Sequence, residues 1–344
     1  MKALLLGGTG TISMDVTRQL VKDGWDVTVM NRGHRKEELP AGVTYLEADL
    51  RVEEEVEEKL SGKSFDSVCD FVCFTAAQAK RDIRLFSGRC GQFVFVSSAS
   101  AYQKPCEHLP ITEETPLANP FWEYSRNKIE CEELLWKEYR ENGFPVTVIR
   151  PSHTYDNRKV PVGVHGNNGS YQVLCRMKAG KPVLIHGDGT TLWTVTHSRD
   201  VAKGFAGLMG NPLAIGEAVQ VTGDEYFTWN RIYEIIAEEM GVKLHAFHVS
   251  SELLAAVSRY NYNGALLGDK ANNMVFDNAK LKRLVPGFEA TIRFREGVRE
   301  SLAYIEAHPE QQMEDPIFDV WCDRVAEMNA YAQRSMKAHL DEYL

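Results

Sequence analysis

The chain has 344 residues, of which 44% are hydrophobic, 25% charged and 10% aromatic, and its net charge is −9. This composition is that of a soluble globular protein without a membrane span. The acidic balance disfavours a nucleic-acid partner, because proteins that bind the phosphate backbone carry a basic face. The seven cysteines are scattered and odd in number. They predict free thiols in a reducing cytoplasm, and we expect no metal site.

The chain opens with a short apolar run, residues 3–6, that stops at glycines. A run of this length is too short to cross a membrane and is typical of a central parallel strand. Gly7 allows a tight turn after it, and Gly10 leaves room for a ligand to approach the backbone. Ser13 stands where a dinucleotide-binding loop usually has its last glycine. The stretch predicts a nucleotide-binding loop, with a plain structural turn as the alternative.

A helix is predicted over residues 14–23, where apolar side chains recur at helical spacing. The start of such a helix carries free amide groups and the positive end of the helix dipole, and both attract a pyrophosphate. Thr11 and Ile12 stand at this start. We therefore expect them to bind a dinucleotide together with Gly7 and Gly10.

Residues 27–31 alternate apolar and polar side chains, which predicts a second strand. In a dinucleotide fold the end of this strand meets the adenosine ribose, and a carboxylate there accepts a hydrogen bond from the 2′-hydroxyl. This chain has Asn31 and then the cationic residues Arg32, Arg35 and Lys36. Asn31 and Arg32 are expected to bind the cofactor. The cations suit a 2′-phosphate and favour NADP over NAD, with a solvated basic loop as the alternative.

Further strands are predicted over residues 43–46, 67–74 and 92–97, and helical segments alternate with them. That alternation predicts a Rossmann-like α/β fold, in which a doubly wound parallel sheet has helices on both faces. Ligands bind such sheets at the carboxyl ends of the strands. Asp49 and Leu50 follow the third strand there and are expected to bind the cofactor. The Asp49 carboxylate would accept a hydrogen bond from an adenine amino group.

Ser98 and Ser100 follow the fifth strand at its carboxyl end, where chemistry takes place in this architecture. Tyr124 and Lys128 come later, four residues apart at the start of a predicted helix, so they lie on one helical face. An ammonium group near a phenol favours the phenolate and lowers the pKa of the phenol, so Tyr124 is expected to exchange a proton near neutral pH. The order of glycine loop, strands, serine and Tyr/Lys pair makes this pair a stronger signal than it is alone.

At these positions the sequence resembles the extended short-chain dehydrogenase/reductase superfamily, and within it the NAD-dependent epimerase/dehydratase family. The likeness rests on the glycine loop, Asp49, Leu50, Ser98 and the pair Tyr124 and Lys128. It covers roughly residues 1–305. Further matching segments lie at residues 150–151, 187–189 and 197–201.

In that family the tyrosine is the acid and base, the lysine holds the nicotinamide ribose and tunes the tyrosine, and a serine or threonine orients the substrate hydroxyl. The resemblance implies these roles for Tyr124, Lys128 and Ser98, with NAD or NADP as cofactor. It implies an epimerase, or a reductase or dehydrogenase, that acts on a hydroxyl-bearing carbon of a sugar-like small molecule. The sequence leaves open whether the hydride returns to the substrate or leaves with the cofactor.

Several residues depart from the family pattern. Dehydratases of this branch carry an acidic pair directly after the serine or threonine, whereas this chain has Ala99 and Ser100, so sugar 4,6-dehydration is disfavoured. An arginine that usually grips a diphosphate is replaced by Trp193, and a usual asparagine by His153. These changes point to a less charged substrate, contacted by Ser100, His153 and Trp193. The alternatives are a packing role for Trp193 and a backbone contact for His153.

Three parts of the chain are expected. Residues 1–150 form the dinucleotide-binding domain, to which later segments could return, residues 151–310 form the smaller substrate lobe, and residues 311–344 form an amphipathic helical tail. From residue 315 apolar side chains keep a spacing of three to four. This stripe is expected to dock on the protein's own body, with a homodimer contact as the alternative.

Other classes of function remain open at this stage. Some relatives of this branch are RNA-binding proteins of plastids, and an NADP-sensing regulator would bind nucleotide without turnover. The retained tyrosine and lysine and the acidic charge favour an enzyme. We therefore expect a cytoplasmic enzyme with a small-molecule substrate and without a nucleic-acid or membrane partner.

Overall fold

The structure, a computed structural model, describes residues 1–342, apart from the side chain of residue 341. The chain forms two compact units, each assembled from three segments. Unit 1 comprises residues 1–156, 194–225 and 275–292. Unit 2 comprises residues 157–193, residues 226–274 and the part of the chain from residue 293 onward.

Unit 1 is built on a seven-stranded sheet with the strand order β10-β6-β5-β4-β1-β2-β3, in which neighbouring strands run parallel. The strand order reverses between β1 and β4, and ligands bind such sheets at the carboxyl ends of the strands beside this reversal. This confirms the predicted Rossmann-like fold. The strands are β1 Lys2–Leu6, β2 Asp26–Asn31, β3 Thr44–Glu47, β4 Ser67–Asp70, β5 Phe93–Val96, β6 Val146–Pro151 and β10 Ala218–Val221.

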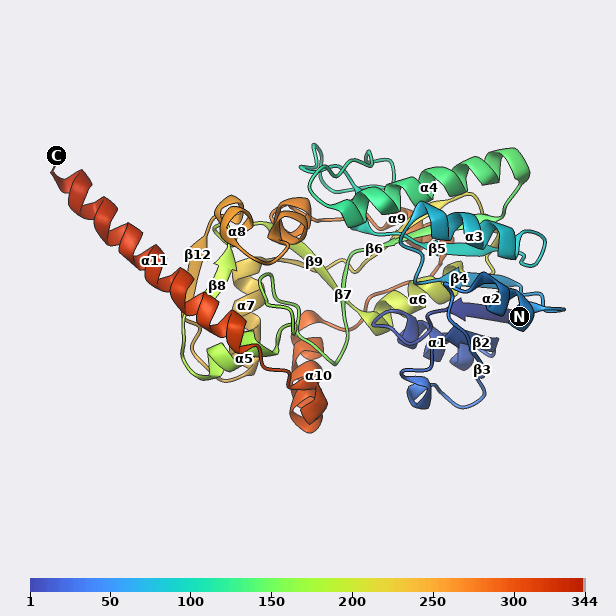
Figure 1. Ribbon diagram of the computed structural model, residues 1–344, viewed down its shortest axis with the longest axis horizontal. Helices are drawn as coiled ribbons and strands as arrows, with labels where there is room; N and C mark the ends of the chain where they lie inside the picture. The colour runs from blue at the N-terminus through green and yellow to red at the C-terminus, as the bar shows by residue number, and fades with distance from the viewer. Residues whose placement is uncertain (343–344) are drawn as a thin grey trace. The chain divides into compact units, whose positions relative to one another are not determined.

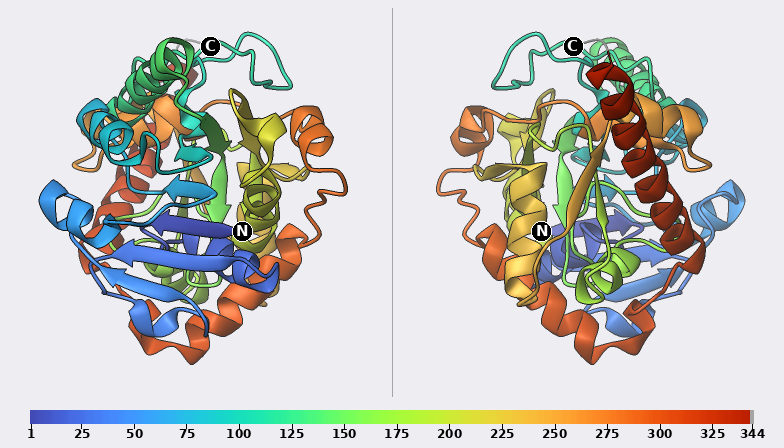
Figure 2. Two further views of the ribbon diagram at one scale, coloured as in Figure 1. Left: turned by 90° about the vertical axis from the view of Figure 1, so that its right-hand side faces the viewer. Right: turned by 90° about the vertical axis from the view of Figure 1, so that its left-hand side faces the viewer.

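Helices cover both faces of this sheet (Figures 1 and 2). The alternation of side chains along β1 explains why: Ala3 and Leu5 are buried in the core on one face, and Leu4 and Leu6 in the core on the other. The first face is covered by α1 Ser13–Lys22, α6 Ser198–Leu208 and α9 Ala279–Leu284. The second face is covered by α2 Glu53–Leu60, α3 Ala76–Phe86 and α4 Glu123–Asn142.

Smaller elements complete unit 1. The strand β7 His153–Tyr155 pairs in parallel with the end of β9 Leu192–His197. Short 3₁₀ helices lie at Lys36–Glu38, Ala99–Ala101 and Pro212–Ala214.

Unit 2 contains a parallel pair of strands, β8 Val183–His186 and β12 Ala246–Val249, and several helices. A wide π-helix spans Asn263–Lys270, and a 3₁₀ helix spans Pro309–Gln311. The remaining elements are β11 Tyr226–Thr228, α5 Tyr171–Lys178, α7 Trp229–Glu239, α8 Ser251–Val257, α10 Phe294–Ala307 and α11 Pro316–Asp341.

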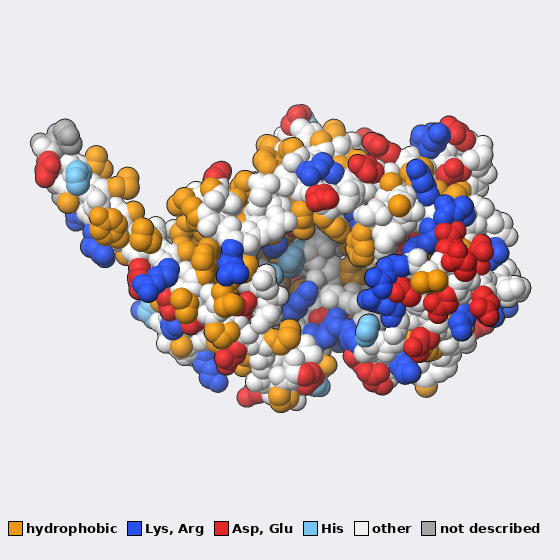
Figure 3. All heavy atoms as spheres, viewed as in Figure 1, with side chains coloured by type: hydrophobic (Ala, Val, Ile, Leu, Met, Phe, Trp, Pro, Cys, Tyr) orange, Lys and Arg blue, Asp and Glu red, His pale blue; other side chains and the backbone are white. Residues whose placement is uncertain are grey.

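The C-terminal helix α11 is attached to unit 2 by its first turns. Phe318 and Cys322 are buried, and Arg176 of α5 forms ion pairs with Asp319 at 2.7 Å and Asp323 at 2.8 Å. Apolar side chains on the distal half of the helix are exposed, and Figure 3 shows them along the helix. They are Met328, Tyr331, Met336 and Leu340. Within residues 1–342, every helix is too short or too polar to cross a membrane.

Candidate active site

The loop after β1 is held in shape by Gly7 and Ser13. Gly7 has φ +80°, and a Cβ added there would lie 2.6 Å from Val72 Cγ1, so only glycine fits. The Ser13 hydroxyl accepts a hydrogen bond from the Gly10 amide and donates one to the Gly7 carbonyl, both at 2.7 Å. A glycine at position 13 could not make these two hydrogen bonds. The Ser13 hydroxyl therefore stabilises the loop by joining its two ends.

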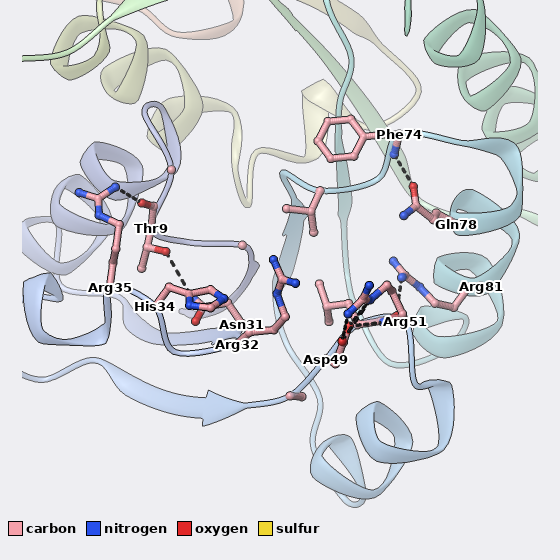
Figure 4. Close-up of a pocket in the computed structure, with 15 residues that line it drawn as sticks. Thr9, Asn31, Arg32, His34, Arg35, Asp49, Arg51, Phe74, Gln78 and Arg81 are labelled. Carbon is pink, nitrogen blue, oxygen red and sulfur yellow. Dashed lines mark hydrogen bonds and ion pairs between the residues drawn. The ribbon is translucent and has the colours of Figure 1, made fainter. Parts of the chain in front are cut away.

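Beside this loop lies a pocket of about 610 Å³, formed by the carboxyl ends of β1, β2, β3 and β4 and by α3 (Figure 4). Six of the predicted cofactor residues line it, namely Gly7, Gly10, Asn31, Arg32, Asp49 and Leu50. Thr11, Ile12 and Lys128 are not among the lining residues; Ile12 precedes α1 and packs against the core. The pocket lies where the strand order predicts a ligand.

The wall of the pocket after β4 was not anticipated from the sequence. Val72, Phe74, Gln78 and Arg81 line it. The apolar pattern predicted a strand to residue 74, but β4 ends at Asp70, whose carboxylate accepts a hydrogen bond from the Val72 amide at 2.6 Å and turns the chain. The position of this segment, at a strand end beside the reversal in strand order, is the signal that could have identified it.

At the end of β2, Asn31 has a structural task. Its side-chain oxygen accepts from the Gly33 amide at 2.8 Å, and its nitrogen donates to the Thr9 hydroxyl at 3.3 Å. The turn presents Arg32, which points toward the middle of the pocket in Figure 4. Arg32 and His34 form no hydrogen bond or ion pair with other described residues. The Arg32 guanidinium and the His34 imidazole therefore line the pocket without a hydrogen bond or ion pair to another described residue.

The other charged groups at this end are already paired. The Asp49 carboxylate accepts from the Arg51 guanidinium at 2.5 Å, and this hydrogen bonding holds the pKa of Asp49 well below its usual range. Arg81 donates to the Leu50 carbonyl at 2.6 Å and so supports the loop after β3. Asp49 remains a candidate contact for adenine, but it shares its carboxylate with Arg51.

Next to Arg81, which lines the pocket, lies a buried group of possible metal ligands, Asp70, Cys73 and Asp82, whose ligand atoms lie within 4.8 Å of one another. Arg81 donates to Asp70 at 3.3 Å and to Asp82 at 2.5 Å. Burial and the neighbouring Asp70 raise the pKa of Asp82 well above its usual value. The Arg81 guanidinium therefore supplies a positive charge to both carboxyl groups.

Lys128 is buried in α4 and binds the end of β5 and the segment that follows β4. Its ammonium donates to the Cys73 carbonyl at 2.6 Å and to the Val96 carbonyl at 2.7 Å. Burial lowers the pKa of Lys128. An ammonium has three N–H donors, and two of them are used here. The amine also lies 5.8 Å from the centre of the Tyr124 ring, which agrees with their predicted position on one helical face.

Tyr124 is half-buried at the start of α4, next to other aromatic rings. Its ring centre lies 5.0 Å from that of Trp122 and 6.3 Å from that of Phe74. Phe74 also lines the pocket. Phe74 therefore lies between the Tyr124 ring and the pocket and contacts both.

Serine hydroxyls connect the end of β5 to the start of α4. Ser98 is half-buried and lies 2.9 Å from the Ser100 hydroxyl, oxygen to oxygen. The Ser100 hydroxyl in turn accepts from Ser125 at 2.8 Å, and Ser125 directly follows Tyr124. Ser125 drew no attention in the sequence, because a lone serine in a helix has no distinctive pattern.

A buried ion pair sets the register of α4. Glu132, one turn after Lys128, accepts from Arg150 of β6 at 2.5 Å and from the Ser97 hydroxyl at 2.5 Å. Both charged side chains are almost completely buried. This pair holds the helix that carries Tyr124 and Lys128 against the ends of β5 and β6.

The two residues proposed from family departures lie in different units. His153 is half-buried in β7 of unit 1, opposite Val195. Trp193 is buried in unit 2, with its ring centre 5.3 Å from that of Trp229. The Trp193 contact is of the kind expected for a core residue. Substrate contacts by His153 and Trp193 stay predictions.

Comparison with known proteins links these features to a family. A family model described as the NAD dependent epimerase/dehydratase family matches residues 3–221. The chain is 26% identical over 290 residues to 2′-dehydrokanamycin reductase of Streptomyces kanamyceticus, covering 84% of this chain and 80% of the relative. It is 27% identical over 253 residues to the chloroplast stem-loop binding protein of 41 kDa b of Arabidopsis thaliana, covering 70% of this chain and 63% of the relative.

A solved structure with the same fold is the UDP-glucuronic acid 4-epimerase of Bacillus cereus, in complex with UDP-glucuronic acid and NAD. The TM-score is 0.71 at 17% identity, and the match covers 89% of this chain and 99% of that one. At this identity the likeness concerns the fold.

Proposed function

The chain belongs to the NAD dependent epimerase/dehydratase family, and from that premise we propose that it is an NAD(P)-dependent epimerase or reductase acting on a hydroxyl-bearing carbon of a sugar-like substrate. The observation that carries the proposal is the arrangement in unit 1 of a glycine-lined pocket, a buried lysine and a half-buried tyrosine. The pocket is formed at strand ends, whereas Lys128 and Tyr124 belong to one helix. A hydride-transfer site requires a cofactor pocket and a proton donor near each other.

The pocket suits a dinucleotide on its own geometry. Gly7 takes a positive φ with Val72 packed closely against it, and the loop ends are tied by Ser13. The third N–H of Lys128 is available for a ribose hydroxyl. A nicotinamide bound beside Lys128 supplies or accepts a hydride.

The proton is assigned to Tyr124. The Lys128 ammonium lies close to its ring and stabilises the phenolate, so the phenol can release and take up a proton. Ser98 contributes a hydrogen bond to the same substrate oxygen. Neither Ala99 nor Ser100, which follow Ser98, can serve as the acid and base that expel water, and this disfavours sugar 4,6-dehydration.

NADP is the cofactor that the pocket's charges favour. Arg32 and His34 have no partners among the described residues, whereas Arg51 and Arg81 are paired with carboxylates. A 2′-phosphate would gain a charge-assisted hydrogen bond from Arg32, and the Asp49 carboxylate that lines the same pocket is bound to Arg51.

Replacement of Tyr124 tests the proposed chemistry. We expect Tyr124→Phe to lower turnover by about 100-fold or more, because it removes the only proposed proton donor, while NADPH binding stays within about twofold. The assay follows NADPH absorbance with a panel of keto sugars, sugar nucleotides and a keto aminoglycoside. Tyr331→Phe, in an exposed part of α11, is the matched control. Full activity of Tyr124→Phe would refute the assignment.

RNA binding is the second candidate, because one relative is a chloroplast stem-loop binding protein. The net charge of −9 opposes it. A gel shift of a labelled RNA stem-loop at sub-micromolar protein, weakening steeply between low and moderate salt, would support this candidate. No shift under these conditions would exclude it.

A further inference from the structure

The hydrogen-bonding direction of Ser98 is set by two serines behind it. We propose that Ser100 and Ser125 are positioning residues, which hold the Ser98 hydroxyl as a hydrogen-bond donor toward the substrate oxygen. This inference rests on the proposed function of the site. It reassigns Ser100 from a substrate contact to a residue that acts through Ser98.

The three hydroxyls form a continuous chain that leads out of the protein interior. Ser125 is completely buried and donates to Ser100 at 2.8 Å. Ser100 is 4% exposed and lies 2.9 Å from Ser98. Ser98, at the outer end, is half-buried and also accepts from the Ser100 amide at 3.1 Å.

Counting protons fixes the direction of this chain. Each hydroxyl carries one proton and two lone pairs. Because Ser125 donates to Ser100, the Ser100 proton must go elsewhere, and Ser98 is its one neighbour in the chain. In the reverse orientation Ser98 would donate to Ser100 and Ser100 to Ser125, and the completely buried Ser125 proton would be left without an acceptor among the described residues, which is costly.

The consequence falls on Ser98. Its two lone pairs are taken by the Ser100 amide and the Ser100 hydroxyl, so its own proton is the group left for the substrate. A hydroxyl or carbonyl oxygen can accept that proton. An ammonium group on the same carbon has no lone pair and would meet a donor. The chain of serines therefore selects a substrate with an oxygen at the reacting carbon, and it stabilises negative charge that develops on that oxygen.

The backbone around the three serines is held independently of their hydroxyls. The Asn119 side chain donates to the Ser100 carbonyl at 2.7 Å and accepts from the Trp122 amide, just before α4, at 3.2 Å. Removing the Ser125 hydroxyl therefore leaves a link between the turn after β5 and the start of α4. A serine-to-alanine variant is expected to fold.

Neutron diffraction from deuterated crystals of the full chain tests the orientation without any substrate. We expect the Ser100 deuterium to lie on the line to the Ser98 oxygen, and the Ser98 deuterium to point away from Ser100. The opposite polarity would overturn the proposal whatever the protein's activity. The result is thus separable from the proposed function.

A double-mutant cycle tests the role in turnover, with the best keto-sugar substrate of the panel. Ser125→Ala should lower kcat about fivefold, the effect of one hydrogen bond, and change KM by less than twofold. In the Ser98→Ala background the same change should have no further effect. Ser67→Ala, which removes another buried hydroxyl that bonds Gln92, is the control and should keep full turnover.

The outcomes distinguish the two proposals. An equal loss from Ser125→Ala in both backgrounds would mean that Ser125 acts through the packing of α4, and would overturn the positioning role. Unchanged turnover in Ser125→Ala would also overturn it. Loss of turnover in Ser98→Ala and Tyr124→Phe, together with no effect of Ser125→Ala, would leave the proposed function standing.

Discussion

Arg32 shows how a single side chain can decide cofactor choice. The pocket contains several arginines, but a cation already paired with a carboxylate offers little further attraction to a phosphate. Arg51 is bound to Asp49, and Arg81 to Asp70 and Asp82. Arg32 has no such partner among the described residues. Sequence analysis named Arg32 within a basic stretch, and the structure shows that Arg35 and Lys36 of that stretch are paired with Glu38 and Glu47.

Arg32→Ala is expected to weaken NADPH binding by about 10-fold and to leave NADH binding within about twofold, because one charge-assisted hydrogen bond to the 2′-phosphate is lost. Fluorescence titration with both cofactors measures this. Arg324→Ala, on the exposed part of α11, is the control. Equal weakening for NADPH and NADH would mean that Arg32 shapes the pocket and does not recognise the phosphate.

At the scale of elements, α4 is the part that assembles the site. Tyr124, Lys128 and Glu132 follow at intervals of four and lie on one face of the helix. Lys128 bonds the carbonyls of Cys73 and Val96, and Glu132 bonds Arg150 and Ser97. The helix therefore cannot slide along the sheet without breaking buried polar contacts, which keeps Tyr124 in register with the strand ends.

Glu132→Gln is expected to lower the free energy of unfolding by about 3 to 5 kcal/mol, because it leaves the Arg150 guanidinium buried without its counter-charge. Urea unfolding followed by circular dichroism measures the change. Glu130→Gln, on the exposed side of the same helix, should cost less than about 0.5 kcal/mol. A similar small effect for both variants would show that the pair contributes no anchoring.

At the scale of the whole molecule, the chain passes repeatedly between two units, each with its own buried interior. Unit 1 supplies every residue proposed for the cofactor and for proton transfer. Unit 2 contains a buried histidine, His186, whose ring nitrogen Nε2 lies 3.0 Å from the Lys270 carbonyl while Nδ1 has no partner. Such a group makes the stability of the protein depend on pH.

Burial lowers the pKa of His186 to about 4. Between its unfolded value near 6.5 and this value, the unfolded state binds a proton that the folded state does not, so stability falls as the pH drops from about 6.5 to about 4. The loss of stability from this group is on the order of 3 kcal/mol once the pH is below about 4, and it is close to zero at neutral pH. Urea unfolding at several pH values should show a shallower decline for His186→Gln, whereas the exposed control His339→Gln should follow the unaltered protein. Identical curves for all three proteins would contradict the assignment.

Local signals determined much of this protein. Strands that end in glycine or serine, and the helical segments between them, depend on neighbours along the chain, so they predicted the doubly wound sheet. Tertiary structure decided what depends on partners distant in sequence. It left Arg32 unpaired while Arg51 was paired, brought Ser125 behind Ser98, and packed Trp193 on Trp229. A residue's type limits which bonds it can form, but only folding determines which partner it meets.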